Sequence, residues 1–248
     1  MSNKRFVMAL IVVVVTMAIL ACSLLSSVPS IPSSVPSLPT SPSGNSGSGS
    51  NGGNGSNTSE VLLKDDFSDS STNWGTGTDA DSSVEYANGG LDISVFKTGL
   101  FVYSTPNDQA YQNVHIEVNI ENHSTDDIAT FGVMCDQQVT TDAYYYFGIS
   151  PNGEYAINKA AVANDDTVLT NDGEWTASDL IKKNAASYQV GADCGSDGTL
   201  TLYVDGQKID SVQDTSYSKG MVGVFAWSAE KPSGASVVFH DFVMSSLK

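Results

Sequence analysis

The stretch NVHIEVNIENHS (113–124) places two carboxylates, Glu117 and Glu121, four residues apart with Asn119 between them. Apolar residues at 114, 116, 118 and 120 alternate with these polar ones, a pattern that predicts a β-strand with one buried and one exposed face. Carboxyl groups ~5–5.5 Å apart form the acid and nucleophile of a retaining glycoside hydrolase. Because an exposed sheet face with alternating polar residues would look the same, both interpretations stay open.

A second candidate for chemistry is the aromatic run 144–147. Strand alternation sends Tyr144 and Tyr146 to one face, and Tyr145 and Phe147 to the other. One pair should pack in the core, and the other could stack on sugar rings or on a peptide. Together with Trp227, Tyr144 and Tyr146 are therefore candidate ligand-binding residues, with ordinary strand packing as the alternative.

Other catalytic patterns are missing from the sequence. It contains no nucleophile elbow, no phosphate-binding glycine loop and no metal-ligand helix. The three histidines, His115, His123 and His240, are far apart in sequence, and none has an evident Ser or Cys partner. These observations favour a non-enzymatic role without deciding it.

Strands are the elements that must position these residues. Eleven short segments rich in β-branched and aromatic residues are separated by Gly, Asn and Asp: 61–67, 84–96, 99–105, 114–121, 130–136, 143–150, 154–160, 186–194, 199–212, 221–228 and 235–245. Asn88-Gly89, Asn152-Gly153 and Asp205-Gly206 suit tight hairpin turns. Only 175–184 could form a short helix, or else a loop. We therefore predict an all-β fold, an antiparallel two-sheet jelly-roll sandwich.

The N-terminus has the features of an export signal. Lys4 and Arg5 precede an uncharged apolar run, and small Ala21 precedes Cys22. The sequence ILAC resembles the bacterial lipobox, which implies cleavage after residue 21 and diacylation of Cys22. The alternative is an uncleaved transmembrane anchor. Both place the remaining chain outside the cytoplasm, and the first predicts a lipid anchor in the cell membrane with Cys22 as the membrane contact.

Residues 22–60 follow as a predicted tether. Prolines recur at 29, 32, 36, 39 and 42 and favour an extended arm, and a Gly/Ser/Asn-rich coil follows them. Neither half has the apolar residues to bury a core. The composition changes at Val61, so residues 61–248 are expected to form one domain.

The net charge and the cysteines indicate which ligands, cross-links and metal sites to expect. The formal net charge of −17 repels polyanions and excludes nucleic-acid binding. Apart from Cys22, only Cys135 and Cys194 remain, and export permits a disulfide between them, with two buried free thiols as the alternative. No CxxC or Cys/His cluster indicates zinc.

The order of these segments resembles the concanavalin A-like lectin/glucanase superfamily, which includes laminin-G-like jelly rolls. The resemblance rests on DDFSD at 65–69, NGGLDISV at 88–95, GTLTLYVDGQKI at 198–209, GMVGVFAWS at 220–228 and VVFHDFVM at 237–244. It implies a jelly roll, and its members include lectins, carbohydrate-binding modules and glycoside hydrolases.

Two site assignments follow only from this resemblance. Laminarinase-type members carry a Glu-x-Asp-x-Glu catalytic strand, which Glu117 and Glu121 match, although Asn119 replaces the central Asp. Many members hold a structural calcium where the first and last strands meet, and Asp66 and Asp241 occupy those strands here. No other cofactor is expected.

The sequence as a whole favours a lipid-anchored, outward-facing binding protein whose jelly roll engages a glycan or another surface polymer without catalysis. A retaining glycoside hydrolase using Glu117 and Glu121 is one alternative. A protein-binding adhesion or envelope-structural lipoprotein is another.

Overall fold

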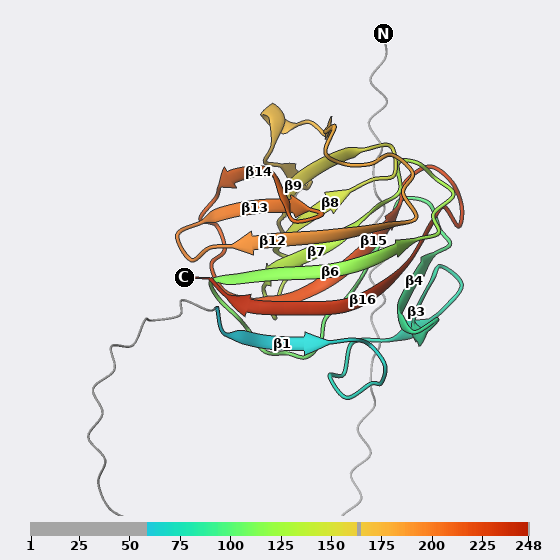
Figure 1. Ribbon diagram of the computed structural model, residues 1–248, viewed down its shortest axis with the longest axis horizontal. Coiled ribbons are helices and arrows are strands. Elements are labelled where there is room, and N and C mark those ends of the chain that lie inside the picture. The colour runs from blue at the N-terminus through green and yellow to red at the C-terminus, as the bar shows by residue number, and fades with distance from the viewer. Residues whose placement is uncertain (1–58, 163–164, 248) are drawn as a thin grey trace, which may run out of the picture. The chain divides into compact units, whose positions relative to one another are not determined.

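The computed structural model describes residues 59–162 and 165–247, and nearly all of their regular structure is β-strand (Figure 1). Sheet A has the order β14 (Gln207–Gln213), β13 (Thr199–Val204), β12 (Ser187–Cys194), β6 (Val114–Asn122), β16 (Ala235–Ser246), β4 (Gly90–Val95), β3 (Ser82–Ala87) and β2 (Gly77–Thr78), with β1 (Val61–Asp65) also paired to β16. Sheet B has the order β10 (Thr167–Val168), β9 (Glu154–Ala160), β8 (Tyr144–Ile149), β7 (Thr130–Gln137), β15 (Met221–Ser228) and β5 (Leu100–Ser104), with β11 (Thr176–Ala177) beside β9. All pairings are antiparallel, as the sandwich prediction requires.

A single apolar layer lies between the two sheets. The apolar residues of β6, at 114, 116, 118 and 120, are each at most 1% exposed, and they belong to the same cluster as Phe131, Tyr145 and Phe147 of sheet B. Tyr145 and Phe147 are therefore the core pair of the aromatic run, and the strand alternation read from the sequence is confirmed. Trp74 closes one end of the layer against Phe242, with 5.0 Å between the ring centroids.

Two of the three predicted hairpin turns have the expected backbone. Asn88-Gly89 and Asp205-Gly206 have positive φ at both residues, which only Gly, Asn and Asp adopt readily. In the turn at 151–153 only Gly153 has positive φ. The 175–184 segment is a loop that contains β11, and the one short helix of the described residues, a 3-10 turn at Asn171–Gly173, precedes it.

Cys135 and Cys194 form a disulfide, which confirms the pairing expected from the sequence. Cys135 belongs to β7 of sheet B and Cys194 to β12 of sheet A, so the bond joins the two sheets across the apolar layer. Both residues are buried, at 0% and 2% exposed. The bond therefore links elements that are adjacent only in the folded state.

Several predictions from the sequence concern residues outside the described part of the chain. They are the signal peptide 1–21, the lipidation site Cys22 and all but the last two residues of the tether 22–60. Within the described residues, no helix is both long and apolar enough to cross a bilayer.

Replacing both cysteines, Cys135→Ala with Cys194→Ala, should lower the free energy of unfolding by about 4 kcal/mol, because the loop of about 60 residues becomes open in the unfolded chain. Urea unfolding measures the difference. The wild type under reducing conditions serves as the control and should approach the double variant. An unchanged unfolding midpoint in both would contradict a stabilising role for the bond.

Candidate functional site

The outer face of sheet B carries a set of aromatic side chains, which we call the aromatic face. Its members are Phe101 and Tyr103 of β5, Tyr144 and Tyr146 of β8, Phe225 and Trp227 of β15, and Trp175 just before β11. Ring contacts connect five of them, and the alternation of β15 places Trp227 on the same side as Phe225. The structure thus brings the three predicted ligand residues, Tyr144, Tyr146 and Trp227, to one face.

Small residues on the middle strands let rings from separate strands meet. Phe101 of β5 stacks on Phe225 of β15 at 4.7 Å and 16°, and lies 5.3 Å from Tyr146 of β8. Strands β7 and β15 lie between β8 and β5, and they present Gly132 and Gly223 on this side. Large side chains at these glycines would hold the rings apart.

The rings also bury a second, smaller apolar cluster outside the main core. Met134 and Phe225 are fully buried beneath them, while Phe101, Trp175, Trp227 and Tyr146 stay partly exposed and Tyr103 is 38% exposed. The aromatic face is therefore packed from below and open above.

Trp175 packs against the sheet at Gly148 of β8, where the missing side chain leaves room for its ring. A Cβ atom added at Gly148 of β8 would lie 2.8 Å from Cη2 of Trp175 and 3.4 Å from Cζ of Phe225. The indole ring thus packs directly over the backbone of β8. This contact adds a large, partly exposed ring that reaches the face from a loop.

Two buried amide side chains beside the rings have unused hydrogen-bonding atoms. Gln137 Nε2 donates to the Tyr103 hydroxyl at 3.0 Å, which leaves Gln137 Oε1 without a partner. Asn158 is paired with Tyr146 across β8 and β9, and its Nδ2 also lacks a partner. These are the only two such buried side-chain atoms in the described part of the chain, and leaving a buried polar atom unpaired costs about 1–3 kcal/mol.

Acidic groups flank the face. The Tyr146 hydroxyl donates to Asp166 Oδ2 at 2.9 Å, and burial raises the pKa of Tyr146 above its ordinary value. Burial likewise raises the pKa of Tyr144. The tyrosines of β8 are therefore neutral hydrogen-bonding groups at physiological pH.

Asp136, next to Gln137 in β7, is 3% exposed, and within the described residues no hydrogen bond or ion pair reaches its carboxyl group. Burial alone raises its pKa from 3.8 to about 7. Its backbone φ is +54°, where β7 shifts its register against β15. This bulge brings Gln137 to the outer side, where it meets Tyr103.

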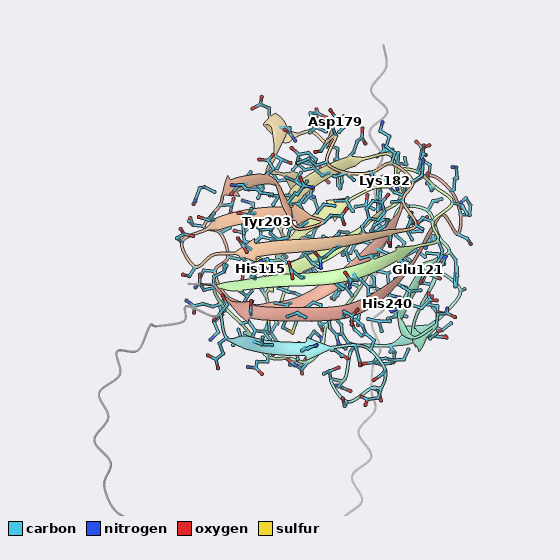
Figure 2. All side chains as sticks on the ribbon, viewed as in Figure 1. His115, Glu121, Asp179, Lys182, Tyr203 and His240 are labelled. Atoms are coloured by element: carbon cyan, nitrogen blue, oxygen red, sulfur yellow. A yellow bond between two sulfur atoms is a disulfide. The ribbon has the colours of Figure 1, made fainter. Side chains whose placement is uncertain are left out.

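The outer face of sheet A is polar, and Figure 2 shows His115, Glu121, Tyr203 and His240 on its strands. His115 Nδ1 lies 2.6 Å from Asp193 Oδ1, and the Tyr203 hydroxyl donates to Asp193 Oδ2 at 2.7 Å. The hydrogen bond to Asp193 raises the pKa of His115. The sequence did not reveal this cluster, because its members come from three strands.

Glu117 and Glu121 lie on this polar face and not on the aromatic face. Glu117 Oε1 is 3.4 Å from His115 Nε2, whereas Glu121 Oε1 is 3.2 Å from His123 Nε2. Glu121 Oε2 also lies 3.6 Å from Nε2 of His240, which pairs with Asn119 across β6 and β16, so histidines contact both carboxylates. Catalysis by this pair stays a prediction.

Asp66 and Asp241 also stay a prediction as calcium ligands. Asp66 Oδ1 accepts a hydrogen bond from the Ser68 amide, and Asp241 Oδ2 accepts one from Asn119 Nδ2. Calcium takes six to eight oxygen ligands. In the described ranges no three His, Cys, Asp or Glu side chains gather around these two residues, so backbone or amide oxygens would have to supply most of the ligands.

Four members of the aromatic face, Phe101, Tyr103, Trp175 and Phe225, were not predicted as site residues. The alternation of GLFVYST (99–105) places Phe101 and Tyr103 on the same side of a strand, which was an available signal. The alternation of MVGVFAWS (221–228) likewise places Phe225 on the side of Trp227. Trp175 had no such signal, because it reaches the face from a loop.

The sequence matches no protein-family model and no curated protein. Solved structures do resemble the fold. The carbohydrate-binding module CBM66 from Bacillus subtilis is 16% identical with a TM-score of 0.53, covering 70% of this chain and 95% of the module. A Bacillus subtilis protein of unknown function with a galectin-like fold is 10% identical with a TM-score of 0.55. The match covers 76% of this chain and 98% of that protein.

A β-glucanase from Bacillus licheniformis is also similar, at 14% identity and a TM-score of 0.50, covering 77% of this chain and all of the enzyme. At these identities the likeness concerns the fold alone. It confirms the fold that the sequence resemblance implied and leaves the ligand to the chemistry of the site.

Asp136→Asn should stabilise the protein at high pH. The carboxyl group is protonated in both states at low pH, and its raised pKa in the folded state makes stability fall as the pH rises from about 4 to about 7. Asn cannot ionise and tolerates positive φ, so the variant should be more stable above pH 7, by up to about 4 kcal/mol.

Urea unfolding of wild type and variant at pH 4, 6 and 8 measures this difference, with exposed Asp108→Asn as the control. If the free energies of unfolding of the wild type and the Asp136 variant differ by the same amount at all three pH values, a raised pKa of Asp136 in the folded state is excluded.

Proposed function

We propose that this concanavalin A-like jelly roll binds carbohydrate through its aromatic face and does so without catalysis. The observation that supports this most is the gathering of partly exposed rings on one face: Phe101, Tyr103, Tyr146, Trp175 and Trp227. Rings offer flat apolar area to the C–H faces of a sugar, and polar atoms set its orientation.

Polar groups at the edge of the face suit sugar hydroxyls. The Tyr146 hydroxyl donates to the exposed Asp166 carboxylate, whose remaining lone pairs can accept from a ligand hydroxyl group.

The fold adds support of a general kind. The similar structures include a carbohydrate-binding module and a β-glucanase. Because the same fold serves unrelated functions, this likeness raises the expectation of a sugar ligand but names no particular glycan.

We further propose that the domain is displayed on the outer side of the cell membrane by lipidated Cys22. The support is the lipobox-like ILAC and the Pro/Gly/Ser-rich tether, both read from the sequence. A tether of this composition would hold the aromatic face away from the membrane surface.

Trp227→Ala and Trp175→Ala should each weaken binding to any glycan that the full chain recognises on a glycan array by tenfold or more, about 1.4 kcal/mol, because each removes a stacking ring. Tyr203→Ala is the matched control, since it removes an aromatic ring from sheet A. An array without signal, or equal losses in all three variants, would contradict the proposed site.

Glu117→Gln and Glu121→Gln should leave glycan binding unchanged, since both lie on the other sheet, and the wild type should release no reducing ends from β-glucan. A reducing-sugar assay on the wild type and on both variants tests this. Hydrolysis that either substitution abolishes would establish the glycoside hydrolase instead.

A further inference from the structure

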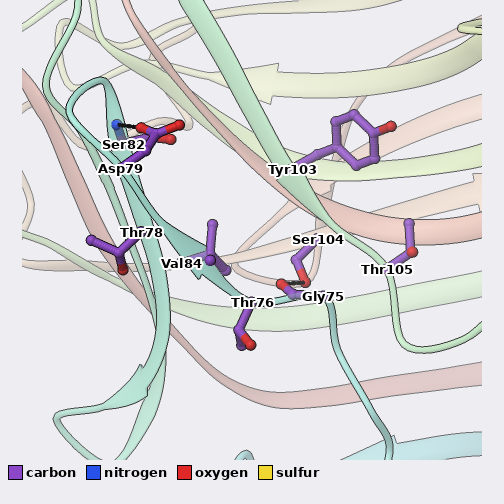
Figure 3. Close-up of a pocket in the computed structure, with 10 residues that line it drawn as sticks. Gly75, Thr76, Thr78, Asp79, Ser82, Val84, Tyr103, Ser104 and Thr105 are labelled. Carbon is purple, nitrogen blue, oxygen red and sulfur yellow. Dashed lines mark hydrogen bonds between the residues drawn. The ribbon is translucent and has the colours of Figure 1, made fainter. Parts of the chain in front are cut away.

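A pocket of about 460 Å³ lies beside the aromatic face, where the edge of sheet B meets the 75–84 segment of sheet A. Figure 3 shows its lining residues on these two sides. They are Gly75, Thr76, Gly77, Thr78, Asp79, Ser82, Val84, Tyr103, Ser104 and Thr105. The volume lies within the roughly 300–1,000 Å³ of small-molecule sites.

Hydrogen bonds join the two sides of the pocket. The Ser104 hydroxyl donates to the Gly75 carbonyl at 2.8 Å, and the Gly75 amide donates to the Thr105 carbonyl at 3.2 Å. Asp79 Oδ1 accepts from the amides of Asp81 and Ser82, which fixes the turn that closes one side. The pocket is therefore preformed, and little ordering would oppose binding.

The lining offers neutral polar groups. The side-chain hydroxyls of Thr76, Ser82 and Thr105 form no hydrogen bond within the described residues, so all three remain available to a ligand. Val84 supplies an apolar patch. The Asp79 carboxylate and the formal net charge of −17 disfavour anions. A neutral compound with many hydroxyl groups fits this chemistry.

Tyr103 connects the pocket with the aromatic face. It lines the pocket, and its ring lies 6.2 Å from that of Tyr144. The strand register aligns Gly148, Gly132, Phe225 and Tyr103 in one row across four adjacent strands, a span of roughly 14 Å. A ligand that reaches from Trp175, above Gly148, to the pocket must be an extended chain and not a single sugar.

We propose that the pocket is a second subsite, which receives a terminal or branch sugar residue of a glycan whose chain lies on the aromatic face. This inference rests on the proposed carbohydrate function and adds to it the class of ligand, an oligosaccharide bound at two adjoining places.

Gly77→Leu is the substitution that tests it. A Cβ atom at Gly77 would meet no atom within 4 Å, and its φ is not positive, so a larger side chain should fill the pocket without straining the backbone. Ser187→Leu is the matched control, because it adds the same side chain at an exposed position of β12, which four strands separate from β2 in sheet A. Thermal unfolding should show both variants folded as the wild type.

The measurement is saturation-transfer NMR on the full chain in detergent, with glucose, galactose, mannose, N-acetylglucosamine and fructose as separate probes. We expect at least one sugar to receive saturation from the wild type, from Ser187→Leu and from Trp227→Ala, whose pocket is intact. Gly77→Leu should reduce that signal by about tenfold, since a blocked site no longer holds the sugar.

Two outcomes overturn the pocket assignment: no probe receives saturation from the wild type, or Gly77→Leu behaves as the wild type. The glycan array separates this failure from that of the proposed function. If Trp227→Ala loses binding on the array and Gly77→Leu has no effect in either assay, the pocket is rejected as a sugar site and the aromatic face is kept. If saturation transfer to a sugar is lost in Gly77→Leu but the wild type binds no glycan on the array, the aromatic face is rejected as a binding site and the pocket is kept.

Discussion

The apolar layer between the two sheets is the constraint on which the rest of the structure depends. Every strand has two faces, and a single layer of buried side chains uses one face of each. In β6 the residues at 114, 116, 118 and 120 pack into this layer, and in β8 Tyr145 and Phe147 do so. The opposite face of sheet A meets solvent, whereas that of sheet B buries Met134 and Phe225 under a layer of partly exposed rings. The Cys135–Cys194 bond joins the two sheets across the apolar layer.

The two free faces differ in chemistry. Sheet A presents charged and hydrogen-bonding groups such as the His115–Asp193–Tyr203 cluster, which are already satisfied by one another. Sheet B presents aromatic rings above a small second cluster and two amide atoms without partners. Satisfied polar groups on a solvated face need no ligand, whereas partly exposed aromatic rings gain free energy when a ligand covers them. This contrast is why we assign binding to sheet B.

The edge of sheet B adds a second consequence of the two-layer architecture. The strand β5 has no further neighbour in its sheet, so the 75–84 segment of sheet A approaches it directly and is joined to it at Ser104 and Thr105. Tyr103, on the same strand, belongs both to this junction and to the aromatic face. The aromatic face and the pocket thus adjoin because both include residues of the edge strand β5.

The sequence by itself determined the all-β class, the core register, the turns at Asn88-Gly89 and Asp205-Gly206, and the division of Tyr144–Phe147 between core and surface. These depend on period-two alternation and on positive φ, which are local properties. Only the tertiary structure decided that Glu121 lies between His123 and His240, that Trp175 packs over Gly148, and that Tyr103 joins a face to a pocket. Strand order, loop path and side-chain direction bring together residues as far apart in sequence as Glu60 and Ser246, 186 positions, and no local pattern encodes such contacts.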